Sequence, residues 1–287
     1  MALTTRIKSS VNQCLKPVNL RVDTLTRENR EASRLEIIER LGQFEQPVFP
    51  LPSSFESMDP APILDEVCRY SKRFDDFENP SQNDARYTFD NIYFTSPDTE
   101  VLYAMIRRTR PTKIIEVGSG NSTKIMRQAI LDGRLATRLI SIDPSPRTEI
   151  SRLVDEFYRQ PVETLENDDL FRSLTENDIL FVDSSHEIKT GNDVVFLYLN
   201  VIPSLRPGVL IHIHDVFLPY DYPREWVLEK RWGFSEQYLL QALLTFSDTF
   251  ELLWAGHFLL KTRPDLQQYF SHLKGRTAKS LWLRKTN

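Results

Sequence analysis

Carboxylate and imidazole side chains recur at one kind of position in this chain, at the end of a short apolar run. Four acids hold such positions: Glu116, Asp143, Asp183 and Asp215. Three of the five histidines fall between positions 186 and 214, close in sequence to the last two acids. Carboxylates and imidazoles together can bind a divalent cation, and a neutral imidazole can remove a proton near pH 7. The pattern therefore predicts a site for metal or acid–base chemistry.

Two short segments supply the candidate metal ligands. Residues 183–186 (Asp-Ser-Ser-His) follow one apolar run, and residues 212–215 (His-Ile-His-Asp) end another. Asp183, His186, His214 and Asp215 could supply oxygen and nitrogen ligands for a divalent ion such as Mg²⁺, Mn²⁺ or Fe²⁺, and the expected set is Asp183, His214 and Asp215.

The same segments could instead supply a general base. His186, with Asp183 beside it, is the expected catalytic residue in that case. Because side chains alternate along a strand, His212 and His214 should share one face of the sheet and Asp215 should lie on the other. His212 is expected to be a core histidine.

A glycine turn at residues 112–124 indicates a ligand site of another kind. Two of the nine glycines, Gly118 and Gly120, follow a β-branched run, and Ser122 is among the residues that can cap the next helix. Thr123 replaces the third glycine of a dinucleotide-binding loop, and the Glu116 carboxylate would repel a pyrophosphate. A cationic or hydroxyl-bearing ligand is therefore expected; an ordinary turn in another Rossmann-like protein is the alternative.

Glu-Val-Gly-Ser-Gly-x-Ser-Thr resembles the first motif of class I S-adenosylmethionine-dependent methyltransferases. Together with Asp-x-Ser-His and His-x-His-Asp, it is most similar to a bacterial group that acts on small molecules. The resemblance implies that S-adenosyl-L-methionine binds at Glu116, Gly118, Ser119, Gly120, Ser122, Asp143 and Asp183. Glu116 would help to hold the ammonium group, and Asp143 would accept the ribose hydroxyls unless it only caps a helix.

The resemblance also bears on the metal. Asp183 and Asp215 fall where catechol-type and macrolide-sugar O-methyltransferases keep magnesium-binding carboxylates. The chain departs from the catechol pattern, because His214-Asp215 stands where that group has Asp-Asn. The expected activity is O-methylation of a small hydroxylated acceptor, such as a sugar or natural-product intermediate. The alternatives are an oxygenase with iron at His186, His214 and Asp215, and a non-catalytic partner-binding protein.

Aromatic residues and prolines concentrate in residues 217–238, directly after the second acid–histidine segment. Such a segment beside a cleft is typical of a lid or an acceptor wall. Tyr222, Trp232 and Tyr238 are expected to face the substrate, or else to cover the edge of the sheet as core residues.

The elements that position these residues follow from apolar runs that alternate with helical patterns. Strands are predicted at 113–117, 138–142, Val162, 178–182, 209–214, 250–254 and 280–284, with helices that include 147–158, 193–202 and 265–273. Fully apolar strands indicate a parallel sheet covered on both sides. We therefore expect an α/β, Rossmann-like, seven-stranded, mostly parallel sheet in a domain of residues 87–287.

Residues 1–86 read as an N-terminal helical extension. A charge-rich amphipathic helix is predicted over 21–41, and five prolines mark an extended connector over 46–62. The apolar side of that helix could pack on the domain or on a second copy of the chain, which would make a homodimer.

Composition limits the class of protein. The chain has 287 residues, of which 40% are hydrophobic and 26% charged, and its net charge of −4 gives no reason to expect nucleic-acid binding. Cys14 and Cys68 form neither a disulfide framework nor a metal motif, and no apolar run is long enough to span a membrane. A cytoplasmic protein whose partner is a small-molecule acceptor is expected.

Overall fold

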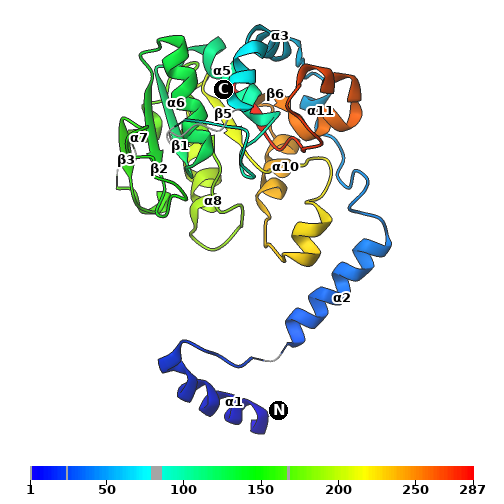
Figure 1. The fold of residues 1–287 in the computed structure, drawn as a ribbon. Coiled ribbons are helices and arrows are strands. Elements are labelled where there is room, and N and C mark those ends of the chain that lie inside the picture. Colours follow the sequence, from blue (N-terminus) through cyan, green and yellow to red (C-terminus); the bar gives the residue numbers. More distant parts are fainter. Residues whose placement is uncertain (1, 24, 79–85, 167–168) are drawn as a thin grey trace. The chain divides into compact units, whose positions relative to one another are not determined.

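The computed structural model describes residues 2–23, 25–78, 86–166 and 169–287 (Figure 1). Contacts within the chain divide it into two compact units: Met1–Gln46 with Pro223–Arg231, and Pro47–Tyr222 with Trp232–Asn287. The predicted boundary at residue 87, placed where the alternation of strands and helices begins, stays a prediction.

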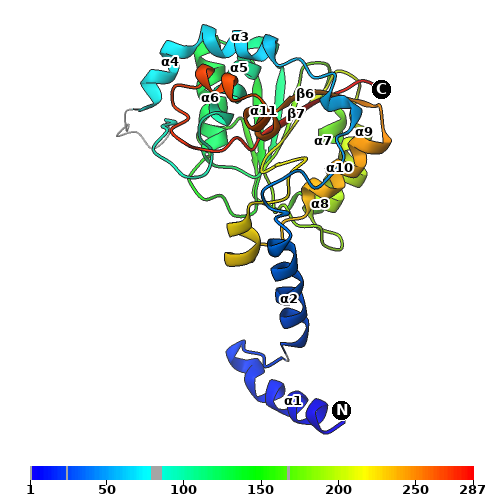
Figure 2. The same ribbon diagram turned by 90° about the vertical axis from the view of Figure 1, so that its right-hand side faces the viewer.

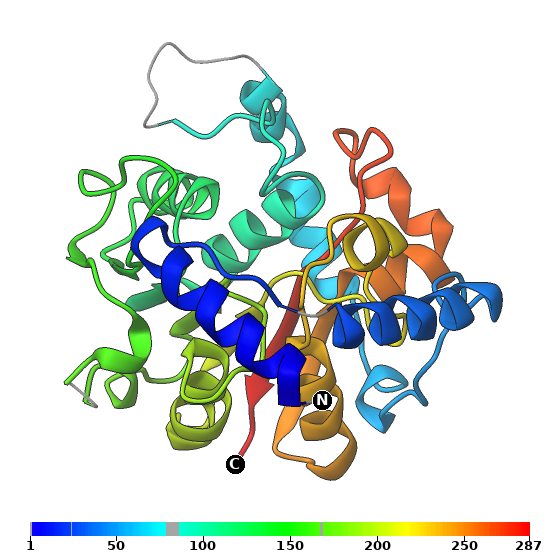
Figure 3. The same cartoon turned by 90° about the horizontal axis from the view of Figure 1, so that it is seen from below.

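The first unit contains two separate helices, α1 (Ala2–Leu15) and α2 (Thr26–Arg40) (Figure 3). The helix predicted over 21–41 corresponds to α2. Within this unit, Arg224 forms an ion pair with Glu39 of α2. Among the described residues, no helix combines the length and the apolar character needed to cross a membrane.

The second unit is built on a seven-stranded sheet with the strand order β3-β2-β1-β4-β5-β7-β6. All neighbouring strands are parallel except β7, which runs antiparallel to both β5 and β6. The strands are β1 (Lys113–Val117), β2 (Arg138–Ile142), β3 (Glu156–Tyr158), β4 (Ile179–Val182), β5 (Leu210–Ile213), β6 (Phe250–Ala255) and β7 (Leu281–Lys285). The predicted α/β fold with a mostly parallel sheet is confirmed.

Helices cover both faces of this sheet (Figure 2). Successive side chains of a strand point to opposite faces, so Ile114 of β1 packs in one apolar core and Ile115 in the other, and both are fully buried. The first core is completed by α3 (Ala61–Arg69), α4 (Ser71–Asp75), α5 (Asp98–Thr109), α6 (Asn121–Gly133) and α11 (Gly256–Thr262). The second is completed by α7 (Asp169–Arg172), α8 (Asp193–Phe196), α9 (Ile202–Ser204) and α10 (Glu236–Phe246).

The register of the parallel strands brings their carboxyl ends to one edge of the sheet. Val117 lies opposite Ile142 of β2 and Val182 of β4, and Val182 lies opposite Ile213 of β5. The residues that follow these strand ends are therefore neighbours: Gly118, Asp143, Asp183 and His214. This edge is where parallel α/β proteins bind their ligands.

Two predicted stretches differ from the structure. The helix predicted over 147–158 is wrong, because 156–158 form β3 and the described residues between β2 and β3 form no helix. The Asp155 carboxylate accepts a hydrogen bond from the Leu139 backbone N–H (2.7 Å), which fixes this segment beside β2. The strand predicted at Val162 is also wrong, since that residue begins a short 3₁₀ turn, Val162–Thr164.

The last predicted helix is shifted. In place of one helix over 265–273, the chain forms α11 directly after β6 and then a 3₁₀ helix, Pro264–Tyr269. Pro264 separates the two, because its ring prevents the α-helix from continuing.

Candidate active site

The glycine turn after β1 lies against the end of β4. Gly118 has a φ of +83°, and a Cβ added there would lie 1.8 Å from the Asp183 carbonyl oxygen. Only glycine allows this approach. At Gly120 an added Cβ meets nothing within 4 Å, so the turn has one side packed on β4 and one side open.

The Glu116 carboxyl group lies beneath this turn and is fully buried. It accepts hydrogen bonds from the hydroxyls of Ser122 (2.7 Å), Thr123 (2.7 Å) and Ser141 (3.1 Å). Burial raises the pKa of Glu116 to about 8, although the three hydroxyls act in the opposite direction. In this structure Glu116 therefore fixes the start of α6 to β1 and β2, and contact with a cofactor stays a prediction.

Asp143 connects the end of β2 to the glycine turn. Its Oδ2 accepts hydrogen bonds from the Ser119 backbone N–H (2.8 Å) and hydroxyl (2.7 Å), and its Oδ1 accepts one from the Ser145 N–H (2.7 Å). The carboxylate thus stands beside the open side of the turn, where both sequence interpretations place it. Binding of ribose hydroxyls stays a prediction.

Three carboxylates surround the His186 ring, which is 5% exposed. Nδ1 lies 2.8 Å from Glu236 Oε2 at the start of α10. Nε2 lies 3.2 Å from Asp183 Oδ1 and 3.6 Å from Asp215 Oδ2. The backbone supports this arrangement, because the His186 carbonyl accepts the N–H groups of Ser235 (2.7 Å) and Glu236 (3.0 Å).

This environment keeps His186 protonated. Burial acts to lower the pKa of His186, but hydrogen bonds to Asp183 and Glu236 outweigh it and hold the pKa well above its usual value. A protonated ring cannot accept a proton. Because a protonated imidazole cannot bind a metal either, the ligand role and the predicted role as a base both require this ring to lose a proton, and both stay predictions.

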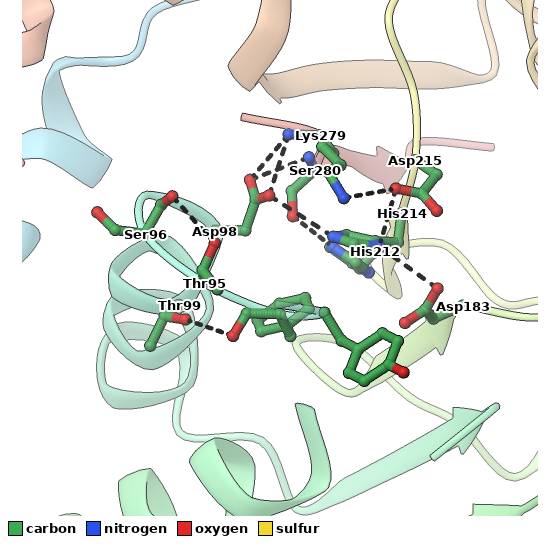
Figure 4. A network of polar contacts seen from close by, with 12 residues as sticks. Thr95, Ser96, Asp98, Thr99, Asp183, His212, His214, Asp215, Lys279 and Ser280 are labelled. Carbon is green, nitrogen blue, oxygen red and sulfur yellow. Dashed lines mark hydrogen bonds and ion pairs between the residues drawn. The ribbon is translucent and has the colours of Figure 1, made fainter. Parts of the chain in front are cut away.

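His214 lies behind the two aspartates and is 3% exposed. Its Nδ1 is 3.3 Å from Asp183 Oδ1 and 3.5 Å from Asp215 Oδ1, and its Nε2 is 3.6 Å from Asp98 Oδ2 (Figure 4). Burial lowers the pKa of His214, but Asp183 and Asp215 raise it to about 10 overall. His214 is thus a buried cation that faces both carboxylates.

The predicted separation of His214 and Asp215 onto opposite faces is wrong. Strand β5 ends at Ile213, and Asp215 has a φ of +54°, so side-chain alternation no longer applies there. The turn brings the Asp215 carboxylate back beside the His214 ring. His212 lies two residues before His214 in β5 and is fully buried. Its ring stacks on Phe181, and its Nε2 lies 2.8 Å from the Ser280 hydroxyl, which confirms it as a core histidine.

Within the part of the chain that the structure describes, one group of side chains could hold a metal ion. Asp183, His186 and Asp215 each offer one ligand atom, and these atoms lie within 4.8 Å of one another. Two oxygens and one imidazole nitrogen suit a divalent first-row ion or Mg²⁺. His186, one of the four possible ligands considered from the sequence, belongs to this group and His214 does not.

The aromatic segment divides between core and surface. Tyr222 is 2% exposed and its hydroxyl accepts the Gln237 N–H (3.0 Å), so it is a core residue and not a substrate-facing one. Trp232 is 42% exposed and stacks on Phe234 at 5.1 Å, and the Phe234 ring lies 4.8 Å from that of His186. Tyr238 is partly exposed and donates a hydrogen bond to Asp221 (2.6 Å).

Sequence reasoning missed several residues of the site: Asp98, Phe234, Glu236 and Lys279. Asp98 and Glu236 stand at the starts of helices, where acids are common for reasons of helix stability alone. No local pattern showed that either one reaches a histidine from a distant segment.

Residues 115–216 match the family described as a methyltransferase domain. A search of curated protein sequences finds no match to the chain. The apo structure of CmcI (N160) is 15% identical with a TM-score of 0.43, covering 69% of this chain and 74% of that chain.

Two further solved structures are similar to this chain, with sequence identities and TM-scores in the same range. The S-adenosylhomocysteine-bound methyltransferase PaMTH1 of Podospora anserina is 16% identical with a TM-score of 0.44, covering 88% of this chain and 96% of that chain. The methyltransferase MycE from the mycinamycin biosynthetic pathway, in complex with Mg, SAH and mycinamycin VI, is 16% identical with a TM-score of 0.40. The match to MycE covers 77% of this chain and 55% of that chain.

Proposed function

We propose that this chain, which contains a class I S-adenosylmethionine-dependent methyltransferase domain, transfers the cofactor's methyl group to a hydroxyl of a small molecule. One observation carries the proposal: the open side of the glycine turn and the Asp183, His186 and Asp215 group occupy adjacent strand ends. A cofactor on β1 and β2 and an acceptor at β4 and β5 would then meet at one edge of the sheet.

The cofactor half of the site is formed by β1, β2 and α6. The open side of Gly120 gives a ligand room to approach the backbone, and the Asp143 carboxylate beside it suits ribose hydroxyls. Asp183 lies between this half and the metal group, because its backbone contacts Gly118 and its carboxylate faces His186 and His214.

The half of the site at the ends of β4 and β5, where the methyl acceptor would bind, has side-chain atoms that suit a divalent ion. Asp183 Oδ1 and Asp215 Oδ2 lie 3.2 Å and 3.6 Å from the same nitrogen of His186, Nε2, so two carboxylate oxygens and one imidazole nitrogen converge on one place. Asp183, His186 and Asp215 would hold Mg²⁺, Mn²⁺ or Fe²⁺, and the bound ion would lower the pKa of an acceptor hydroxyl. Glu236 would then keep the His186 ring oriented through Nδ1.

The remaining residues position the acceptor. Phe234 packs on the His186 ring, and the exposed Trp232 ring stacks on Phe234. These rings can shield the reacting oxygen from water on that side. Transfer would form the oxygen–methyl bond, break the sulfur–methyl bond to leave S-adenosylhomocysteine, and pass the hydroxyl proton to water, and its rate would depend chiefly on alignment.

Methyl transfer from radiolabelled S-adenosylmethionine to a panel of sugars, phenols and hydroxylated natural products tests this function. Activity should require a divalent ion, fall with chelator, and fall at least about a hundredfold in Asp215→Asn. Lys274→Met, which removes a surface lysine paired with Glu78, is the control. Oxygen consumption with added iron would instead favour the oxygenase, and cofactor binding without turnover would favour a partner-binding protein.

A further inference from the structure

Lys279 brings a positive charge to the metal group from a distant part of the chain. Its Nζ lies 3.3 Å from Asp215 Oδ1, and its side chain is 23% exposed (Figure 4). The residue stands two positions before β7, whose antiparallel direction brings its first residues to the carboxyl edge of β5. Lys279 therefore reaches Asp215 from the side of β5 that is opposite to the cofactor strands β1 and β2.

The backbone that carries Lys279 is fixed by a buried carboxylate. Asp98, 3% exposed at the start of α5, accepts the backbone N–H groups of Lys279 (3.0 Å) and Ser280 (3.0 Å). The same carboxylate lies 3.6 Å from Nε2 of His214. Asp98 thus fixes the backbone from which the Lys279 side chain reaches Asp215, and the same carboxylate lies beside His214.

The two oxygens of Asp215 have different surroundings. Oδ2 lies 3.6 Å from His186 Nε2, within the metal group, whereas Oδ1 lies 3.5 Å from His214 Nδ1 and 3.3 Å from Lys279 Nζ. A divalent ion at this carboxylate would share it with the Lys279 ammonium group. Like charges a few ångströms apart repel strongly in a partly buried site.

We propose that Lys279 is a tethered cation that orients Asp215 and competes with the divalent ion for its carboxylate. This inference rests on the proposed metal site and adds a means of regulating it. Lys279 stabilises the metal-free arrangement and weakens metal binding, so that the ion binds reversibly. His214 is too deeply buried to move away, whereas the lysine is partly exposed on a flexible stem and can yield.

Binding of Mn²⁺ tests this proposal without a known acceptor. Calorimetry and the electron paramagnetic resonance of free Mn²⁺, at low ionic strength, would compare the full-length wild type with Lys279→Met and Lys279→Gln. Both variants should bind Mn²⁺ at least about tenfold more tightly, because a nearby positive charge is removed. Lys279→Arg should stay within about threefold of the wild type, because it keeps the charge.

Two controls separate the inference from the metal site itself. Lys274→Met removes another ion-paired lysine, whose partner Glu78 is outside the metal group, and should leave Mn²⁺ affinity unchanged. Asp183→Asn should abolish the binding. If Asp183→Asn abolishes binding but Lys279→Met and Lys279→Gln bind as the wild type does, the role of Lys279 is refuted and the metal site stands. If no form binds Mn²⁺, or Asp183→Asn binds normally, both are refuted.

Discussion

Two glycines of one turn have opposite requirements. At Gly118 an added methyl group would overlap the Asp183 carbonyl, whereas at Gly120 it would project into open space. We expect Gly118→Ala to lower the melting temperature markedly, because β1 and β4 must separate. Gly120→Ala should melt like the wild type but bind S-adenosylhomocysteine at least about tenfold more weakly, because its methyl group fills the space left for the ligand. Thermal melting would measure the stability of both variants, and calorimetry would measure their affinity for S-adenosylhomocysteine. An unchanged affinity in Gly120→Ala would contradict the proposed cofactor position.

Glu116 should make the stability of the protein depend on pH. Its pKa is raised by burial to about 8 in the folded chain, from 4.5, so the folded state binds the proton more tightly than the unfolded state. The resulting stabilisation is complete below pH 4.5 and is lost as the pH rises through 8. Its full extent is up to about 5 kcal/mol.

Glu116→Gln should remove this dependence, since glutamine keeps a carbonyl acceptor for the hydroxyls and does not titrate. Urea unfolding between pH 5 and 8 would measure the difference between the two proteins. The free energy of unfolding of the wild type should fall relative to that of the variant as the pH rises. A constant difference across this range would contradict a buried, neutral Glu116.

At the scale of elements, the strands could be predicted from the sequence because the pattern of apolar residues determines them. Gly118, Asp143 and Asp183 follow strands that are short runs rich in apolar, β-branched residues. Such a run is the usual sequence pattern of a buried parallel strand, so these strands could be predicted. The segment between β2 and β4 was mispredicted because tertiary hydrogen bonds determine it. Asp155 binds the Leu139 N–H and pairs with Arg127 of α6, and neither partner is near it in sequence.

The site was predicted only in part for a related reason. Asp183, His186 and Asp215 directly follow strands, so topology alone brings them together. Glu236 and Lys279 arrive from segments whose path across the sheet edge no local pattern specifies. The raised pKa of His186 depends in part on Glu236, and it therefore could not be inferred from the sequence.

A single buried carboxylate joins the starts of two central strands at the edge opposite the site. Asp178, 1% exposed, accepts hydrogen bonds from the backbone N–H groups of Thr112, Lys113 and Thr175, and from both threonine hydroxyls. Asp178→Ala should lower the free energy of unfolding by about 3–5 kcal/mol, because five donors lose their acceptor. Urea unfolding measures this, with Thr175→Ala as a milder control, and a loss below about 1 kcal/mol would contradict the assignment.

At the scale of the whole molecule, the first unit exposes many apolar side chains. Val18, Leu20, Leu25, Ile37 and Leu41 are each about half exposed or more. The homodimer predicted through the N-terminal helix stays a prediction. Sedimentation equilibrium should show a dimer that Ile37→Lys with Leu41→Lys converts to a monomer, because charges are costly to bury. A wild-type monomer at all concentrations would contradict it.

The whole account depends on a nucleoside cofactor at the carboxyl edge of β1 and β2. The most direct measurement is calorimetric titration of the full chain with S-adenosylhomocysteine, with Asp143→Ala as the test variant and Lys274→Met as the matched control. The wild type and Lys274→Met should bind one equivalent with the same affinity. Asp143→Ala should bind at least about tenfold more weakly, because it loses a charge-assisted hydrogen bond. No heat of binding in the wild type, or equal affinity in Asp143→Ala, would contradict the account.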